Sequence, residues 1–128
     1  MAKNAWRLIF VEGLLANYLG GKYAWTFRVH RPGSNDFSEG QIIEGHFKDG
    51  ISLLLEVLEK PRVKPFRDIT EAERTEWNHG EVISHKDMME IMGQYNPEVV
   101  DDTMAVLIKL RLARIDGRPI AGFLPELP

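Results

Sequence analysis

Histidine and carboxylate side chains are the groups in this sequence that could do metal or acid–base chemistry. The four histidines are His30, His46, His79 and His85. No two of them have the i, i+4 spacing that places two zinc ligands on one face of a helix. His79, Glu81 and His85 lie close together in the sequence, but we predict a turn between them. We therefore expect no metal site.

Motifs for nucleophilic catalysis and nucleotide binding are also missing from the sequence. The chain has no cysteine, which excludes thiolate catalysis and thiolate metal sites. It has no Gly-rich loop placed between a strand and a helix, and Gly20-Gly21 is better explained as the end of a helix. Helix capping or a solvated face explains each carboxylate. We therefore expect a protein that is not an enzyme and has no cofactor.

Three carboxylates gather at the start of a helix that we predict from Asn96-Pro97 onward. Asparagine is a good N-cap, and proline is favoured at the first helical position. Glu98, Asp101 and Asp102 then project outward near the positive end of the helix dipole. Acids at this position would repel the phosphates of DNA. The acidic face at these residues therefore indicates a basic protein partner.

Basic side chains collect in three other parts of the chain. These are a predicted strand, a proline-containing connector and a predicted hairpin. The residues are Arg28 and Arg31; Lys60, Arg62, Lys64 and Arg67; and Arg111, Arg114 and Arg118. If the three groups converge, they would form a surface for DNA. The alternative is a solvated, charge-balanced surface, because 16 basic residues face 19 acidic ones in the whole chain.

The elements that position these groups lie between residues 84 and 124. Ser84 caps a helix that Gly93 ends. We predict a second, longer helix over 97–110, because apolar residues recur there about once per turn. They are Val100, Met104, Leu107 and Leu110. A hairpin with strands at 113–115 and 120–124 follows, around the turn Asp116-Gly117.

This order of helix, turn, helix and hairpin resembles the winged helix-turn-helix superfamily. The residues that carry the resemblance are Met104, Leu107, Leu110, Leu112 and the turn Asp116-Gly117-Arg118. Family members usually have a glycine between the second helix and the first wing strand, where this chain has Arg111. The resemblance covers about a third of the chain, and it implies a fold without implying a function.

The N-terminal part of the chain predicts a helix followed by strands. A helix over 5–19 is favoured, because apolar residues lie on nearly every side of it; a strand over 6–11 is the alternative. Residues 22–31 predict a strand, in which Tyr23, Trp25, Phe27 and Val29 form an apolar face. The opposite face is predicted to be basic and exposed to solvent. A loop over 32–40 and a second strand over 41–47, paired with the first, would follow.

The middle of the chain predicts two more helices. Ile51, Leu54, Leu55 and Leu58 form one face of a helix over 49–59, which Pro61 ends. Residues 60–67 contain two prolines and should be extended. Thr70 and Glu73 form a capping box for a short helix to Asn78. Residues 82–83 would add a short strand.

Composition bounds the class of protein. With 128 residues and 44% hydrophobic content, the chain can bury a core without disulfides. The net charge of −3 and the pI of about 5.8 are less basic than is usual for a dedicated nucleic-acid binder. The longest apolar run is too short to span a bilayer, and we expect neither a signal peptide nor a membrane partner. We expect a cytoplasmic protein.

These patterns together predict an α/β (α+β) fold with an N-terminal extension, residues 1–46, and a winged-helix-like domain, residues 47–128. We expect a regulatory or inhibitory protein-binding module that docks a basic partner through Glu98, Asp101 and Asp102. Small acidic proteins from phages and mobile elements act in this way. The alternative is a DNA-binding regulator that uses the basic hairpin and connector. Residues 5–19 would form the interface of a homodimer, because their apolar surface would otherwise be exposed to solvent.

Overall fold

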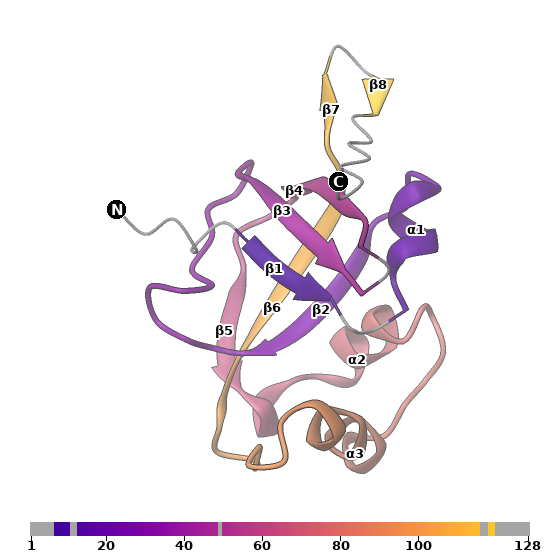
Figure 1. The fold of residues 1–128 in the computed structure, drawn as a ribbon. Helices are drawn as coiled ribbons and strands as arrows, with labels where there is room; N and C mark the ends of the chain where they lie inside the picture. Colours follow the sequence, from indigo (N-terminus) through magenta and orange to yellow (C-terminus); the bar gives the residue numbers. More distant parts are fainter. Residues whose placement is uncertain (1–6, 11–12, 49, 116–117, 120–128) are drawn as a thin grey trace.

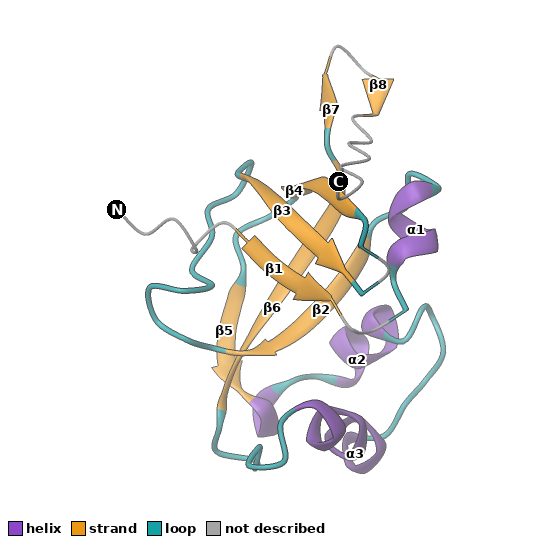
Figure 2. Ribbon diagram, in the orientation of Figure 1, coloured by secondary structure: helices purple, strands orange, loops and turns teal. Residues whose placement is uncertain are grey.

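The computed structural model describes residues 7–10, 13–48, 50–115 and 118–119. The described residues form an α+β structure in which a curled sheet is flanked by short helices (Figure 1, Figure 2). The strands are β1 (Arg7–Phe10), β2 (Ala24–Val29), β3 (Ile42–Phe47), β4 (Ser52–Val57), β5 (Arg62–Pro65), β6 (Met104–Leu112), β7 (Arg114–Ile115) and β8 (Arg118–Pro119). The helices are α1 (Leu15–Leu19), α2 (Glu71–Trp77), α3 (His85–Tyr95) and the 3-10 helix η2 (Phe66–Asp68).

The main sheet has six strands. Five of them follow the order β1-β3-β4-β6-β2, and β5 pairs with the same edge of β6 as β4 does, but at other residues. Strand β6 is the centre of the arrangement. Its residues 105–110 pair with β2 along one edge, while the other edge pairs first with β5 and then with β4. Curling brings the outer strands β1 and β2 toward each other, and Arg28 Nη1 donates to the carbonyl oxygen of Ile9 at 2.7 Å. The sheet is therefore an open barrel with a seam between β1 and β2.

The inside of the barrel holds the larger of two apolar clusters. Alternate residues of the strands supply it, because successive side chains in a strand point to opposite faces. Members with almost no exposure are Phe10, Tyr18, Ile43, Leu53, Leu55, Val57, Val106, Ile108 and Leu110. Phe10 stacks on Phe47, with ring centroids 4.7 Å apart. Gly45 leaves the space for this packing, because a Cβ there would lie 2.9 Å from Leu55 Cδ1 and 3.0 Å from Phe10 Cε1.

The second cluster lies between the outer face of the sheet and the helices α2 and α3. The sheet supplies Trp25, Phe27, Ala105 and Leu107, and η2 with the segment after it supplies Phe66 and Ile69. Helix α3 adds Met88 and Met92, which recur at the helical spacing of four. The two helices thus cover one side of the barrel (Figure 1).

Strand β2 was predicted correctly as a strand, but one of its two faces was not. Trp25 and Phe27 are buried beneath the helices, as expected. The other face, which we predicted to be exposed to solvent, is buried at Ala24 and Thr26, which lie inside the barrel. Tyr23, expected in the core, is 47% exposed. A strand covered by helices outside and by other strands inside has no solvated face.

The predicted second helix of the winged helix-turn-helix is wrong, because residues 104–112 form strand β6. Val106, Ile108, Leu110 and Leu112 follow a period of two toward the barrel, while Ala105 and Leu107 face the helices. A strand buried on both faces reads as an almost continuous apolar run, in which residues at helical spacing also occur. The described residues therefore do not form a winged-helix module.

The predicted helix over 49–59 is also wrong, because residues 52–57 form strand β4. Leu53, Leu55 and Val57 are buried at a period of two. The consecutive residues Leu53, Leu54 and Leu55 satisfy a helical and a strand pattern equally, and sequence periodicity cannot separate them. The predicted strand at 82–83 is absent, since these described residues belong to the connection between α2 and α3.

The N-terminal segment follows the alternative rather than the favoured prediction. Residues 7–10 form a strand that pairs in parallel with β3, and among the described residues of this segment only 15–19 are helical. Leu8, Phe10, Leu14 and Tyr18 are buried in the protein's own core. Part of the apolar surface that suggested a homodimer through residues 5–19 is therefore covered within one chain, while Ile9 and Leu19 are 64% and 40% exposed. The dimer stays a prediction.

Capping signals located the helices α2 and α3 correctly. Thr70 and Glu73 form the expected capping box, and Ser84 accepts a hydrogen bond from the N–H of Asp87. Helix α3 continues through Gly93 to Tyr95, so Asn96 ends this helix and does not begin another. The connector 60–67 is extended over Arg62–Pro65, as expected.

The loop over 32–40 and the strand over 41–47 are confirmed, but β3 pairs with β1 and β4 and not with β2. A hairpin is present as predicted after β6, but β7 at 114–115 pairs with β8 at 118–119, whereas the return strand was predicted at 120–124. Its turn Asp116-Gly117 and the residues 120–124 lie outside the described residues. One sheet contains strands from both sides of the predicted boundary at residue 46.

Candidate functional site

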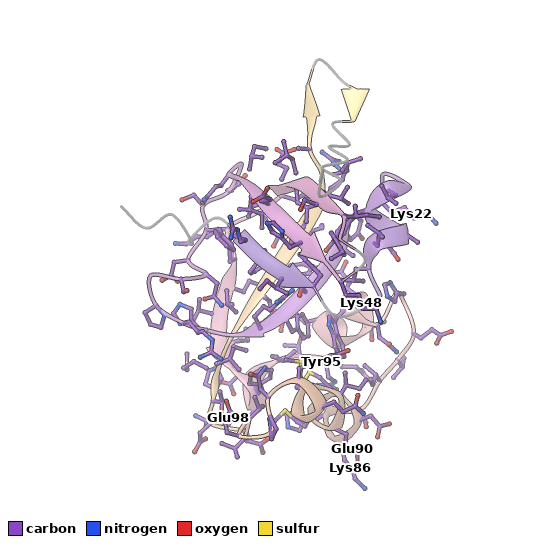
Figure 3. All side chains as sticks on the ribbon, viewed as in Figure 1. Lys22, Lys48, Lys86, Glu90, Tyr95 and Glu98 are labelled. Carbon is purple, nitrogen blue, oxygen red and sulfur yellow. The ribbon has the colours of Figure 1, made fainter. Side chains whose placement is uncertain are left out.

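A hollow lined by aromatic side chains lies between β2, α2 and α3. We call it the aromatic recess. Its volume is about 160 Å³, and it is lined by Gly13, Leu14, Trp25, Phe27, Trp77, Asn78, His79, Ile91, Met92 and Tyr95. Trp25, Phe27 and Met92 are each only 3% exposed and form its floor. Figure 3 shows Tyr95 on α3, on the side of the helix nearer the sheet.

Contacts hold three of the rings that line the aromatic recess, those of Trp25, Phe27 and Trp77. Phe27 stacks on Trp77 with centroids 4.9 Å apart and ring planes only 9° from parallel. The indole Nε1 of Trp25 donates to Glu76 Oε1 at 3.1 Å. The guanidinium carbon of Arg62 lies 4.7 Å from the ring of Trp25. These three rings are therefore held in place before any ligand arrives, which lowers the entropy cost of binding.

His79 lies at the rim, and its backbone is unusual. The N–H of His79 donates to Glu76 O at 3.2 Å, and that of Gly80 donates to Thr75 O at 2.8 Å. This pair of bonds is a Schellman motif, in which the residue in the left-handed conformation is usually glycine. Here it is His79, with φ of +59°. A non-glycine residue in this conformation costs free energy and occurs often at functional sites.

A second hollow shares His79 with the aromatic recess. We call it the polar trough. It has a volume of about 480 Å³ and is lined by Asn17, Lys22, Tyr23, Ala24, Glu76, His79 and Gly80. Its groups include a cation, a carboxylate, an amide and a phenol, so they can both donate and accept hydrogen bonds. His79 thus lines both the aromatic recess and the polar trough.

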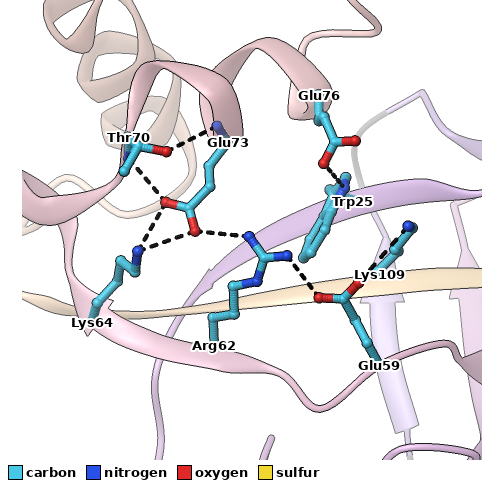
Figure 4. A network of polar contacts seen from close by, with 8 residues as sticks. All are labelled: Trp25, Glu59, Arg62, Lys64, Thr70, Glu73, Glu76 and Lys109. Carbon is cyan, nitrogen blue, oxygen red and sulfur yellow. Dashed lines mark hydrogen bonds and ion pairs between the residues drawn. The ribbon is translucent and has the colours of Figure 1, made fainter.

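A network of ion pairs fixes α2 on the sheet beside the aromatic recess (Figure 4). Both carboxylate oxygens of Glu73 take part: Arg62 donates at 2.9 Å and Lys64 at 3.0 and 3.1 Å. Glu73 also accepts from the Thr70 N–H at 2.9 Å. Arg62 reaches Glu59 at 2.8 Å, and Glu59 lies 3.8 Å from Lys109.

This network shifts the ionisation of its members. Burial alone would raise the pKa of Glu73, but the Thr70 N–H and the Lys64 and Arg62 side chains hold that pKa below its usual value. The hydrogen bond to Glu73 raises the pKa of Arg62. Both groups are therefore charged at neutral pH, and α2 is held by ionic as well as apolar contacts.

The predicted acidic face does not exist as a helix face. Glu98, Asp101 and Asp102 lie in the turns between α3 and β6. Asp101 Oδ1 lies 2.9 Å from His85 Nε2, and Asp102 forms an ion pair with Arg67. Figure 3 shows Glu98 at the periphery, away from Tyr95. Two of the three carboxylates are thus engaged within the chain.

The predicted basic residues also separate. Arg62 and Lys64 bind Glu73, Arg67 pairs with Asp102, and Arg111 lies 3.8 Å from Glu56; the exposed Lys60 precedes β5. Arg114 and Arg118 belong to the paired strands β7 and β8. Arg28 and Arg31 do come together, at a hollow on the barrel seam. The described basic side chains therefore do not form one face.

Sequence reasoning missed the residues of the aromatic recess. Trp77 was interpreted as an anchor for its helix, and Trp25 and Phe27 as ordinary core. No sequence signal pointed to His79, because the left-handed position at a helix end is usually glycine and Gly80 was the residue expected to end this helix. The same part of the chain was considered for metal binding, and no group of three or more potential ligands occurs among the described residues.

Comparisons with known proteins bear on the fold alone. No family model and no curated protein sequence matches the chain. A solved structure, the crystal structure of hypothetical protein PH0355, is similar with a TM-score of 0.60 and 22% sequence identity. The similarity covers 83% of this chain and 96% of that one. The α+β architecture therefore occurs in a second protein over nearly its whole length.

None of the described helices has the length and apolar character needed to cross a bilayer.

Proposed function

We propose that this protein is a non-enzymatic binding module whose ligand is a planar heterocycle of the nucleobase type, held in the aromatic recess. The observation that carries the proposal is the hollow of about 160 Å³ between Trp25, Phe27, Trp77 and Tyr95, with His79 at its rim. A comparable cavity of about 150 Å³ in another protein holds benzene. The aromatic recess thus suits one ring, with any polar or sugar substituent in the polar trough.

The chemistry of the rim favours a heterocycle over a plain hydrocarbon. His79 and Asn78 line the aromatic recess, and Glu76 lies in the polar trough beside it. Their side chains can donate to and accept from ring nitrogens and exocyclic groups. Stacking on aromatic side chains contributes about 1–3 kcal/mol per base, whichever base is bound.

A methylated ammonium is the other ligand that aromatic rings often bind. The contacts of Trp25 argue against it. Its ring already faces the guanidinium of Arg62 at 4.7 Å, and the Lys109 ammonium lies 5.8 Å from its centre. A further cation in the same place would be repelled by these two charges. A neutral heterocycle meets no such repulsion.

The docking of a basic protein through Glu98, Asp101 and Asp102 depended on a helix that is not formed. We therefore assign the binding role to the aromatic recess. The DNA-binding alternative required the basic groups to converge, and the described ones are mostly engaged with carboxylates. A cytoplasmic location stays a prediction from the absence of cysteine.

Calorimetric titration with adenosine, guanosine, cytidine and uridine tests the proposal, with trimethylammonium as the competing ligand class. We expect saturable binding of at least one nucleoside, and Trp77→Ala should weaken it by about tenfold or more, since stacking is lost. Val82→Ala is the matched control, because Val82 is 72% exposed and does not line the aromatic recess. Thermal melting of each variant checks that it is folded.

The proposal fails if no nucleoside binds at millimolar concentration, or if Trp77→Ala and Val82→Ala bind equally well. Stronger binding of trimethylammonium than of every nucleoside would identify the aromatic recess as a cation site instead.

A further inference from the structure

The aromatic recess and the polar trough are lined by the same parts of the fold. They share His79, and three segments contribute to both: the residues at and just before α1, those around the start of β2, and the end of α2 with the turn after it. We propose that the polar trough binds the ribose of a ribonucleoside whose base lies in the aromatic recess, and that Glu76 recognises the 2′- and 3′-hydroxyl groups. This inference rests on the heterocycle binding proposed above.

Glu76 connects the two hollows. Its Oε1 accepts from the indole Nε1 of Trp25 at 3.1 Å, and Trp25 forms part of the floor of the aromatic recess (Figure 4). Its Oε2 has no hydrogen-bond partner among the described residues, and Figure 4 shows it directed away from the indole. Because Glu76 also lines the polar trough, this second oxygen is an acceptor for a ligand that lies there.

Two neighbouring side chains of the polar trough supply donors. Asn17 has an amide and Lys22 an ammonium, and both groups donate hydrogen bonds. Their backbones are joined, because the N–H of Lys22 donates to the carbonyl oxygen of Asn17 at 3.0 Å. The wall beside them is held by Tyr23, whose ring centre lies 4.3 Å from the ammonium nitrogen of Lys109. The polar trough therefore presents a carboxylate acceptor together with donors on a fixed backbone.

This combination of groups fits the hydroxyls of a sugar. A hydroxyl donates one hydrogen bond and accepts others, so it can donate to the carboxylate of Glu76 while it accepts from Asn17 or Lys22. Ribose carries two such hydroxyls on adjacent carbons. The 2′-hydroxyl is also the group by which a protein distinguishes a ribonucleoside from a deoxyribonucleoside. A free base would occupy the aromatic recess alone and would leave the polar trough without a ligand.

Calorimetric titration with matched ligands tests the proposal. One set contains adenine, adenosine and 2′-deoxyadenosine, and a second set contains uracil, uridine and 2′-deoxyuridine. In the set that binds more tightly, we expect the ribonucleoside to bind about tenfold or more tightly than the free base and the deoxyribonucleoside, because a hydrogen bond to a charged group is gained. In NMR spectra, the ribonucleoside should shift the amide signals of Asn17 and Gly80 further than the free base does.

Glu76→Gln removes the charge but keeps a side-chain oxygen that can accept from the Trp25 indole. This change should weaken ribonucleoside binding by about fivefold or more, because a hydrogen bond to a charged acceptor becomes a neutral one. The affinity for the free base should stay nearly unchanged. Glu71→Gln is the matched control, because Glu71 lies on the same helix, is exposed and lines neither hollow. Thermal melting checks that both variants are folded.

The outcomes separate this inference from the heterocycle binding on which it rests. Equal affinity for the base, the ribonucleoside and the deoxyribonucleoside would overturn the role of the polar trough and leave heterocycle binding intact. Equal weakening by Glu76→Gln and Glu71→Gln would remove Glu76 from sugar recognition. If no ligand of either set binds at millimolar concentration, both proposals are overturned.

Discussion

At position 79, a glycine would favour stability, whereas the proposed binding favours the histidine that is present. Its left-handed backbone, with φ of +59°, is the conformation that glycine adopts at no steric cost. The same residue lines both the aromatic recess and the polar trough. A residue retained against a local steric cost is expected where its side chain has a use.

Replacing His79 by glycine separates the two effects. We expect His79→Gly to raise the free energy of unfolding by about 0.5–1 kcal/mol, because the cost of the left-handed residue exceeds the entropy cost of glycine. The same change should weaken heterocycle binding. Urea unfolding and calorimetry measure the two results. His79→Asn is the control, since asparagine tolerates this conformation but has no imidazole; a loss of stability in His79→Gly would contradict the assignment.

Gly45 has a packing role that also belongs to single residues. A Cβ at this position would lie 2.9 Å from Leu55 Cδ1 and 3.0 Å from Phe10 Cε1, both side chains of the barrel core. We expect Gly45→Ala to lower the free energy of unfolding by about 1–3 kcal/mol through overpacking. Gly93→Ala in α3 is the matched control, because a Cβ there meets nothing within 4 Å. It should stabilise the helix by roughly 0.5–1 kcal/mol, and equal changes in the two variants would refute the packing argument.

Among the elements, the capped helices were predictable and the strands β4 and β6 were not. A cap is a local signal: Thr70 with Glu73, and Ser84 before α3, act on the N–H groups a few residues away. The apolar runs in β4 and β6 contain residues at both helical and strand spacing. Their conformation is decided by pairing with distant strands, such as Val106 with Val63 and Arg28, which a single sequence does not reveal.

Helix α2 depends on Glu73 for its attachment, and this gives a pH prediction. The pKa of Glu73 is lower in the folded protein than its ordinary value of 4.5. A lowered folded-state pKa contributes stability above the unfolded value, and this contribution is lost as pH falls through the folded-state pKa. Urea unfolding at pH 7 and at acidic pH should therefore show a steeper loss of stability in the native protein than in Glu73→Gln. Parallel pH profiles would show that the network does not contribute.

For the whole molecule, both hollows are products of the tertiary fold. The aromatic recess joins Gly13, Trp25, Trp77 and Tyr95, which lie far apart in the sequence, and the hollow on the barrel seam is lined by Arg7, Arg28 and Arg31. Sequence reasoning recognised Arg28 and Arg31 as basic residues of the first predicted strand and placed Arg28 on its solvated face. Neither hollow could be predicted, because the pairing of β2 with β6 and the curling of the sheet had to be known first.

The most direct test follows the indole N–H signals of Trp25 and Trp77 by NMR while nucleosides are added. Binding in the aromatic recess predicts that the signal of Trp77, which is stacked on Phe27, moves saturably with the ligand. It also predicts that Trp77→Phe, which keeps a ring, retains more affinity than Trp77→Ala. Signals that stay unchanged throughout the titration, or that move only at residues outside the aromatic recess, would contradict the account.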